Sequence, residues 1–228
     1  MIHRTRIKIC GLRQRADLDA AVEAGADAIG LVFYPKSARF VSAADAAALI
    51  ASLPPYVQAV GLLVNATVEE ASQILAQAPV AALQFHGDES VEQCVAIATA
   101  VQRPFTRALA VRPEMAGADL LEWERRYRAA SPLFSGLVLD AFVDGYGGGG
   151  KVFDWSLVPK ELAPRAVLSG GLNAQNAAEA VRGLRPYAVD VSSGVEASKG
   201  IKDAVRIREF IAVVRAADIQ SSEQRESA

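Results

Sequence analysis

The feature that most constrains the fold of this chain is a regular alternation between short apolar runs and longer segments with helical periodicity. Eight runs have the length and apolar character of buried strands: residues 6–10, 28–33, 59–64, 82–86, 105–110, 136–141, 165–169 and 188–192. Strands this apolar are covered by helices, which indicates a parallel sheet. Because eight strand–helix units close on themselves, we predict an α/β protein that forms a single (βα)8, or TIM, barrel.

Helix-capping residues support this periodic pattern. Ser42 precedes the second helical segment, and the pairs Thr67 with Glu70 and Ser90 with Gln93 have the capping-box spacing. These signals place helix starts between the predicted strands, where the crossover connections of a parallel sheet belong.

An open, doubly wound parallel sheet is the alternative fold. It would bind ligands in a crevice at a topological switch point. In this sequence, however, residues with reactive or charged side chains lie at or after the ends of many predicted strands, namely Cys10, Arg39, His86, Asp140 and Ser193. Barrels gather the carboxyl ends of all strands at one mouth, so this distribution favours the barrel.

Length and charge limit the class of protein. A chain of 228 residues suits one barrel domain, which we expect at residues 1–219, followed by a polar tail, residues 220–228, that we expect to be disordered. The formal net charge of -2, without a long basic run, argues against a nucleic-acid or membrane-surface partner. Residues 1–6 lack the apolar run of a signal peptide, and no apolar segment reaches the roughly 20 residues that span a bilayer. We therefore expect a cytoplasmic protein that acts on a small molecule.

Two cysteines, Cys10 and Cys94, do not resemble a disulfide framework or a zinc set, and we expect both to be reduced. Cys94 lies among apolar residues of a helical segment and is expected in the core. The chain has two histidines and no set of His, Cys and carboxylate residues with metal-ligand spacing. We therefore predict no metal site.

Two consecutive strand ends have the composition of anion-binding turns. Gly170 and Gly171 follow the seventh strand, and Ser192, Ser193 and Gly194 follow the eighth. Backbone N–H groups of such turns can point outward, and glycine removes the Cβ that would block an anion. Each turn alone could be an ordinary strand–helix connection. Because TIM barrels place a phosphate site after strands seven and eight, the pair predicts a phosphorylated small-molecule substrate.

A glycine-rich run, residues 145–151, follows the sixth strand. It fits the dinucleotide-binding motif by accident, because that motif opens a helix in the first strand–helix turn. It fails as a Walker A loop because Val152 stands where a Ser or Thr hydroxyl is required. We expect a flexible flap over the barrel mouth, and a passive crossover is the alternative.

Asp140 and Cys10 end the sixth and first strands, on faces that we predict to line the barrel. A partly desolvated carboxyl suits a general acid, although an aspartate that caps a helix or anchors a loop fits equally well. A lone cysteine is more often a small buried hydrophobe. Here, however, Lys8 and Arg6 share its face, and their charges would lower the pKa of the thiol and favour a thiolate that can abstract a proton.

Arg39 and His86 are candidates for the substrate pocket. Arg39 lies in a polar loop, either as a solvated charge or as a bidentate clamp for a carboxylate. His86 has Gln84 on the same face and either lines the pocket or is a satisfied loop histidine.

One contact inside the barrel follows from strand alternation alone. Lys8 shares a face with Cys10, and Asp190 shares a face with Ser192. Closure of the barrel brings strands one and eight together. We therefore predict a buried ion pair between Lys8 and Asp190.

Taken together, these motifs resemble the phosphoribosylanthranilate isomerase family over about residues 6–213. The segments that carry the resemblance are residues 8–11 (KICG), 30–33 (GLVF), 37–39 (SAR), 83–89 (LQFHGDE), 139–140 (LD), the glycine run through 153–155 (FDW), 169–172 (SGGL) and 190–196 (DVSSGVE). Their number and order make a chance match implausible.

The resemblance implies a cofactor-free enzyme of tryptophan biosynthesis that converts N-(5-phosphoribosyl)anthranilate to 1-(2-carboxyphenylamino)-1-deoxyribulose 5-phosphate by an Amadori rearrangement. It implies that Asp140 is the acid that opens the furanose ring and that Cys10 is the base that removes the proton on C2. Arg39 would meet the anthranilate carboxylate, and the backbone around Gly171 and Ser193 would hold the phosphate. We expect a monomer or a homodimer.

Three positions depart from the family pattern. Ala38 and Lys199 stand where proline is usual, and Gly149 stands where threonine is usual; each change would loosen a loop.

Two other functions stay open. Another sugar-phosphate isomerase, such as the histidine-pathway enzyme, resembles a two-aspartate catalyst and so fits Cys10 poorly. A non-catalytic phosphate-binding barrel fits poorly with the presence of both Cys10 and Asp140.

Overall fold

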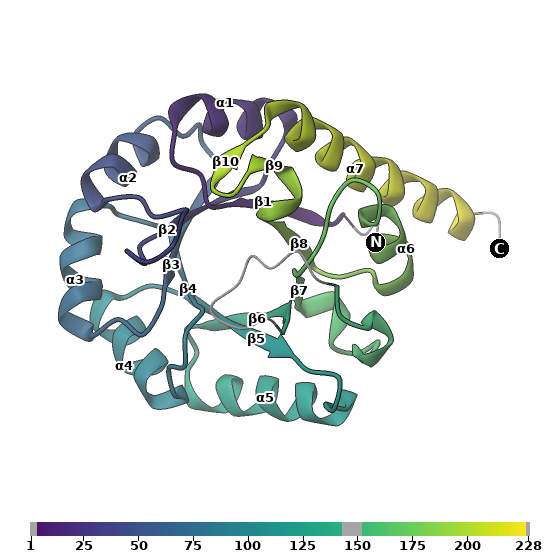
Figure 1. Cartoon of the computed structure of the whole chain (residues 1–228). Helices are drawn as coiled ribbons and strands as arrows, with labels where there is room; N and C mark the ends of the chain where they lie inside the picture. Colours follow the sequence, from purple (N-terminus) through teal and green to yellow (C-terminus); the bar gives the residue numbers. More distant parts are fainter. Residues whose placement is uncertain (1–3, 143–151, 227–228) are drawn as a thin grey trace.

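The protein is a closed barrel of eight parallel strands in the computed structural model, which describes residues 4–142 and 152–226 (Figure 1). The barrel strands follow one another around the ring in chain order. They are β1 (Arg6–Cys10), β2 (Ala28–Val32), β3 (Gln58–Leu63), β4 (Ala82–Phe85), β5 (Phe105–Val111), β6 (Phe134–Ala141), β7 (Val167–Leu168) and β8 (Ala188–Val191). The predicted TIM-barrel fold is confirmed.

Among the residues that the structure describes, seven α-helices form a layer around the barrel (Figure 1). They are α1 (Arg15–Ala24), α2 (Ala43–Ile50), α3 (Val68–Gln77), α4 (Val91–Val101), α5 (Gly117–Ala130), α6 (Ala177–Leu184) and α7 (Ala204–Glu226). The capping residues act as the sequence predicts: the Ser42 hydroxyl accepts from the backbone of α2, and both predicted capping boxes form at the starts of α3 and α4.

The alternation of side chains along each strand separates the core from the site. On β1, Ile7 and Ile9 are fully buried within the hydrophobic core, whereas Lys8 and Cys10 point to the other side of the sheet. β1 and β8 close the barrel with Lys8 directly opposite Asp190. The apolar residues therefore pack beneath the helices, and the polar ones gather inside the barrel.

Two regions differ from the regular strand–helix repeat. Between β6 and β7 the described residues form two short 3-10 turns, η1 (Trp155–Leu157) and η2 (Ala163–Arg165), and no α-helix. After β8 it forms a third turn, η3 (Ser193–Val195), and then an antiparallel hairpin of β9 (Glu196–Ser198) and β10 (Ile201–Lys202). The sequence did not predict this hairpin, which lies over the barrel mouth next to β1 (Figure 1).

Two predictions concern the glycine-rich loop after β6 and the C-terminal tail. The predicted flap, residues 145–151, lies outside the described residues. The helix α7 continues to Glu226 and so enters the segment 220–228; the disorder expected there stays a prediction. Among the described helices, none has the combination of length and apolar character that a membrane crossing needs.

Candidate active site

The carboxyl end of β1 holds a buried thiol. Cys10 is 5% exposed, and a Cβ on Gly30 of the neighbouring strand β2 would lie 2.6 Å from its Sγ atom. Only glycine at that position leaves room for the thiol. Burial raises the pKa of Cys10, the charges of Lys8 and Lys202 oppose this, and the charge of Asp190 adds to it. Burial is the largest of these effects, so the thiol form is favoured.

This corrects one prediction about Cys10. We expected cations on its face to bring its pKa below the ordinary value, but the pKa is raised. Arg6 does not help, because it lies at the start of β1, exposed, with its guanidinium 4.5 Å from the centre of the Tyr187 ring. Lys202, which the sequence did not suggest, is the second cation whose charge favours the Cys10 thiolate, the role that we had expected of Arg6.

The predicted ion pair between Lys8 and Asp190 is confirmed. Lys8 Nζ lies 2.8 Å from Asp190 Oδ2, and it also donates to Gln84 Oε1 at 2.9 Å. Burial would lower the pKa of Lys8, but the neighbouring Asp190 and Cys10 bring it above its ordinary value. Lys8 is therefore a permanently charged ammonium beside the thiol.

The carboxyl end of β6 holds a buried carboxyl group. Asp140 is 9% exposed, and its Oδ1 atom accepts a hydrogen bond from the N–H of Ala141 at 2.8 Å. Its Oδ2 atom lies 3.2 Å from His86 Nε2. Gly170, with φ +77, packs against this group, because a Cβ there would lie 2.8 Å from Asp140 Oδ1. Asp140 and His86 also line one cavity of about 340 Å³.

His86 belongs to a loop that a buried carboxylate holds in place. Glu89 accepts hydrogen bonds from the N–H of Gly87 at 2.9 Å and from the N–H of Asn65 at 2.7 Å. Arg107 of β5 contacts the same carboxylate at 2.7 Å. The loop after β4 is therefore tied to its neighbours on both sides, and His86 has a fixed position next to Asp140.

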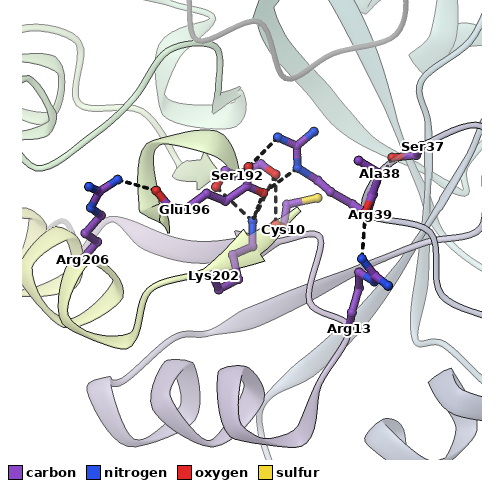
Figure 2. Close-up of polar contacts among 9 residues, drawn as sticks. All are labelled: Cys10, Arg13, Ser37, Ala38, Arg39, Ser192, Glu196, Lys202 and Arg206. Atoms are coloured by element: carbon purple, nitrogen blue, oxygen red, sulfur yellow. Dashed lines mark hydrogen bonds and ion pairs between the residues drawn. The ribbon is translucent and has the colours of Figure 1, made fainter. Parts of the chain in front are cut away.

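Arg39 is not a solvated charge. Its Nε and Nη2 atoms donate to the two carboxylate oxygens of Glu196 at 2.7 and 2.8 Å, and the residue is 8% exposed (Figure 2). Gly11 leaves room for the arginine stem, since a Cβ there would lie 2.6 Å from Arg39 Cδ. The predicted bidentate clamp exists, but in this structure it holds Glu196.

Lys202 joins Arg39 and Glu196 to the end of β1 (Figure 2). Its ammonium donates to Glu196 Oε1 at 2.8 Å and to the Ser192 carbonyl at 2.9 Å, and the Ser192 hydroxyl donates to the Cys10 carbonyl at 3.0 Å. Burial would raise the pKa of Glu196, but Arg39 and Lys202 bring it below its ordinary value. The cluster therefore has two cations and one carboxylate.

The two glycine-containing turns lie against each other. A Cβ on Gly194 would lie 1.9 Å from the carbonyl oxygen of Leu172, so the turns after β7 and β8 touch through their backbones. Gly170 and Gly171 both have positive φ, +77 and +65, which favours glycine. Ser193 is half-buried at the start of η3. The geometry brings the predicted phosphate residues together, except that the Ser192 hydroxyl is directed to β1.

Sequence reasoning missed Glu196, Lys202 and the contact of Gln84 with Lys8. Gln84 had a signal, because strand alternation places it inside the barrel, where an amide needs partners. Glu196 and Lys202 had none, because they meet only through the hairpin that follows η3.

Both cysteines are free, and Cys94 is buried as expected. Within residues 4–142 and 152–226, no cluster of three or more His, Cys, Asp or Glu residues could hold a metal ion.

Comparisons with known proteins agree over nearly the whole chain. A family model described as N-(5'phosphoribosyl)anthranilate (PRA) isomerase matches residues 7–213. A relative from Herminiimonas arsenicoxydans, named N-(5'-phosphoribosyl)anthranilate isomerase, is 64% identical over 218 residues that cover 96% of each chain. The crystal structure of phosphoribosyl anthranilate isomerase from Thermotoga maritima is similar with a TM-score of 0.80 at 40% identity, covering 93% of this chain and 99% of that one. A crystal structure of a phosphoribosyl anthranilate isomerase in complex with reduced 1-(o-carboxyphenylamino)-1-deoxyribulose 5-phosphate is similar with a TM-score of 0.77 at 39% identity, with the same coverage.

Proposed function

The chain belongs to the N-(5'-phosphoribosyl)anthranilate isomerase family, and from that premise we propose that Cys10 is the general base and Asp140 the general acid of its reaction. The protein is an isomerase of tryptophan biosynthesis that converts N-(5-phosphoribosyl)anthranilate to 1-(2-carboxyphenylamino)-1-deoxyribulose 5-phosphate. The observation that carries the proposal is the presence of one buried thiol and one buried carboxyl group at the carboxyl ends of β1 and β6 of one closed barrel.

The reaction requires one proton to be given and one to be taken. Asp140 protonates the furanose ring oxygen while the bond from that oxygen to C1 breaks, and the nitrogen lone pair forms the C1–N double bond of a Schiff base. The thiolate of Cys10 then removes the proton on C2, and these electrons form the C1–C2 double bond as the Schiff base becomes an enolamine. Proton return to C1 and loss of the C2 hydroxyl proton give the ketone. Atoms and electrons balance within the substrate.

The surroundings of Cys10 suit a base that is uncharged until it is needed. Burial favours the thiol, whereas the ammonium groups of Lys8 and Lys202 stabilise the thiolate once it forms. Burial also keeps the thiolate poorly solvated, which strengthens it as a base. We propose that these two cations set the fraction of Cys10 that is ionised.

The two ends of the substrate would bind on opposite sides of these groups. The touching turns at Gly170, Gly171, Ser193 and Gly194 suit the phosphate, because their backbones lie close together without side chains between them. Arg39 suits the anthranilate carboxylate. Among the described residues, its Nη1 atom has no hydrogen-bond partner, so Arg39 can bind a second carboxylate while it holds Glu196. Fixing both ends would place C1 and C2 between acid and base.

The test uses the loss of phosphoribosylanthranilate fluorescence as the ring opens and rearranges. Cys10→Ala and Asp140→Asn should each lower kcat by roughly 10²-fold or more, the usual worth of a positioned acid or base. Binding of the reduced product analogue should weaken far less, because neither group is needed to hold it. Near-normal turnover in either variant would remove that residue from its role. The monomer or homodimer state and the cytoplasmic location stay predictions.

A further inference from the structure

We propose that Gln84 is a positioning residue that fixes which nitrogen of His86 carries the proton, and that it thereby keeps the acidic proton of Asp140 available for the substrate. The inference rests on the proposed role of Asp140 as the acid. It concerns a line of polar side chains inside the barrel that ends at Asp140, and whose inner members Asp190, Lys8 and Gln84 have no contact with the substrate in the proposed reaction.

The line runs from β8 to β6 through four contacts. Asp190 Oδ2 lies 2.8 Å from Lys8 Nζ, and Lys8 Nζ lies 2.9 Å from Gln84 Oε1. Gln84 Nε2 lies 3.1 Å from His86 Nδ1, and His86 Nε2 lies 3.2 Å from Asp140 Oδ2. Gln84 is 1% exposed, so water cannot replace either of its partners.

The direction of every hydrogen bond follows from the ammonium group. A lysine ammonium has three donors and no acceptor, so the Gln84 atom that faces it must be the carbonyl oxygen. The pKa of Lys8 is raised by Asp190 and Cys10 in spite of burial, which keeps the ammonium charged. The Gln84 amide nitrogen is then left to face His86. Because that nitrogen only donates, His86 Nδ1 must accept and cannot carry a proton.

The neutral tautomer of His86 with the proton on Nε2 is the one that meets this condition. An imidazolium would place the Nδ1 proton against the Gln84 amide protons, donor against donor. Turning the amide around would instead place its NH2 group against the Lys8 ammonium. Each alternative leaves a buried polar group unsatisfied, which disfavours it. The line therefore selects one protonation state of His86.

This state has a consequence for Asp140. With its proton on Nε2, His86 places an N–H group 3.2 Å from Asp140 Oδ2, while the N–H of Ala141 donates to Oδ1. The positive ends of both N–H groups stabilise the carboxylate that forms when Asp140 gives its proton away. In the opposite tautomer the Nε2 lone pair would face Asp140 and accept the proton that the substrate needs. Gln84 prevents that competition without touching the substrate.

The other charged groups near His86 do not supply this control. They line the same cavity from the loop after β4 and from β5 and its end, and they are Asp88, Arg107 and Arg112. Arg107 is engaged with Glu89 and with the Gly87 carbonyl, and Arg112 lies over the Phe142 ring at 4.2 Å. The described contact of His86 Nδ1 is with Gln84 alone.

The proposal is tested first in the unaltered protein by nitrogen-15 NMR of the imidazole rings. The chain has only two histidines, His3 and His86, so the signals are assigned with a single His3→Gln variant. We expect His86 to show an unprotonated Nδ1 and a protonated Nε2. A protonated Nδ1, as the opposite tautomer or as an imidazolium, would overturn the proposal.

Gln84→Glu then reverses the polarity without changing the shape. A carboxylate at this position accepts from Lys8 and from an Nδ1 proton, so His86 Nδ1 should become protonated. We expect kcat to fall by about tenfold or more while KM changes by less than about threefold, because the proton donor is affected and substrate binding is not. Gln58→Glu, the same change at an exposed position of β3, is the matched control and should leave both constants unchanged.

Gln84→Met provides a second variant of similar length that neither donates nor accepts. It should give a mixture of the two neutral tautomers and an intermediate kcat. A changed tautomer with unchanged kcat in either variant contradicts the proposal, as does an unchanged tautomer in Gln84→Glu. If Asp140→Asn instead retains turnover, the acid assignment fails, whereas the NMR result in the unaltered protein still decides the role of Gln84.

Discussion

Replacing Lys8 by methionine should destabilise the protein by about 4 kcal/mol at pH 7. The change keeps the length of the side chain but removes the charge that faces Asp190, in a pair whose side chains are only 10% and 5% exposed. At 2.8 Å and an effective dielectric constant of about 20, the lost attraction is about 6 kcal/mol. Desolvation of the ammonium offsets part of it, and removal of one partner from a buried pair costs about 3–5 kcal/mol in practice.

Protonation of the Asp190 carboxyl group in Lys8→Met limits the loss of folding stability and makes this loss depend on pH. The carboxyl group left behind can take up a proton, which at pH 7 costs about 4 kcal/mol for a group with an ordinary pKa of about 3.9. In the variant the folded state therefore binds a proton that the unfolded state does not. Its stability falls as the pH rises above about 3.9, so the loss relative to the unaltered protein should shrink from about 4 kcal/mol at pH 7 to about 1.5 kcal/mol at pH 5.

Denaturation with guanidinium chloride at both pH values measures these differences by linear extrapolation. The control is the double variant Lys8→Met with Asp190→Leu, which removes both charges. It should cost about 1–3 kcal/mol, because Gln84 Oε1 still loses its donor. A Lys8→Met loss below about 1 kcal/mol at pH 7, or a loss that grows on acidification, would refute the view that this pair is buried and charged.

Two further predictions concern activity. Asp190→Asn should move the rising limb of the kcat/KM pH profile to lower pH, because the Asp190 charge adds to the raised pKa of Cys10 and the base acts only when deprotonated. Lys8→Met should move this limb to higher pH, because it removes a charge that favours the thiolate. A shift in the same direction in both variants would exclude this electrostatic account. Arg39→Ala should raise KM by roughly 10-fold or more through loss of a charge-assisted contact, with inhibition by inorganic phosphate unchanged. Glu196→Gln is its matched partner: it frees Arg39 without removing it, so a smaller rise in KM is expected, and an equal loss of phosphate affinity in Arg39→Ala would assign Arg39 to the other end of the substrate.

The sequence determines the barrel and its interior better than it determines the loops. Strand periodicity of two fixes which face each residue occupies, and closure fixes that β1 meets β8, so the contact of Lys8 with Asp190 follows from local pattern and topology. The contact of Arg39 with Glu196 joins residues 157 positions apart, one in a loop and one in a hairpin. No periodicity specifies how such segments pack. The expectation that Arg6 would lower the pKa of Cys10 was wrong for a different reason. Two residues on the same face of a strand can still lie far apart along it, and Arg6 lies exposed at the start of β1.

The charges around Cys10 match a substrate with two anionic ends. Lys8, Lys202 and Arg39 are three cations, and Asp190 and Glu196 are the two carboxylates paired with them, so one positive charge is left over on this side of the mouth. Without the carboxylates, three buried cations would repel one another, and burial would drive a proton off a lysine. With them, each cation lies in a fixed place beside a carboxylate, although burial still lowers the pKa of Lys202, and we propose that the surplus charge attracts the anthranilate carboxylate and stabilises the thiolate. Because Glu196 accepts hydrogen bonds from both Arg39 and Lys202, we propose that this carboxylate links substrate binding at Arg39 to the ionisation of Cys10.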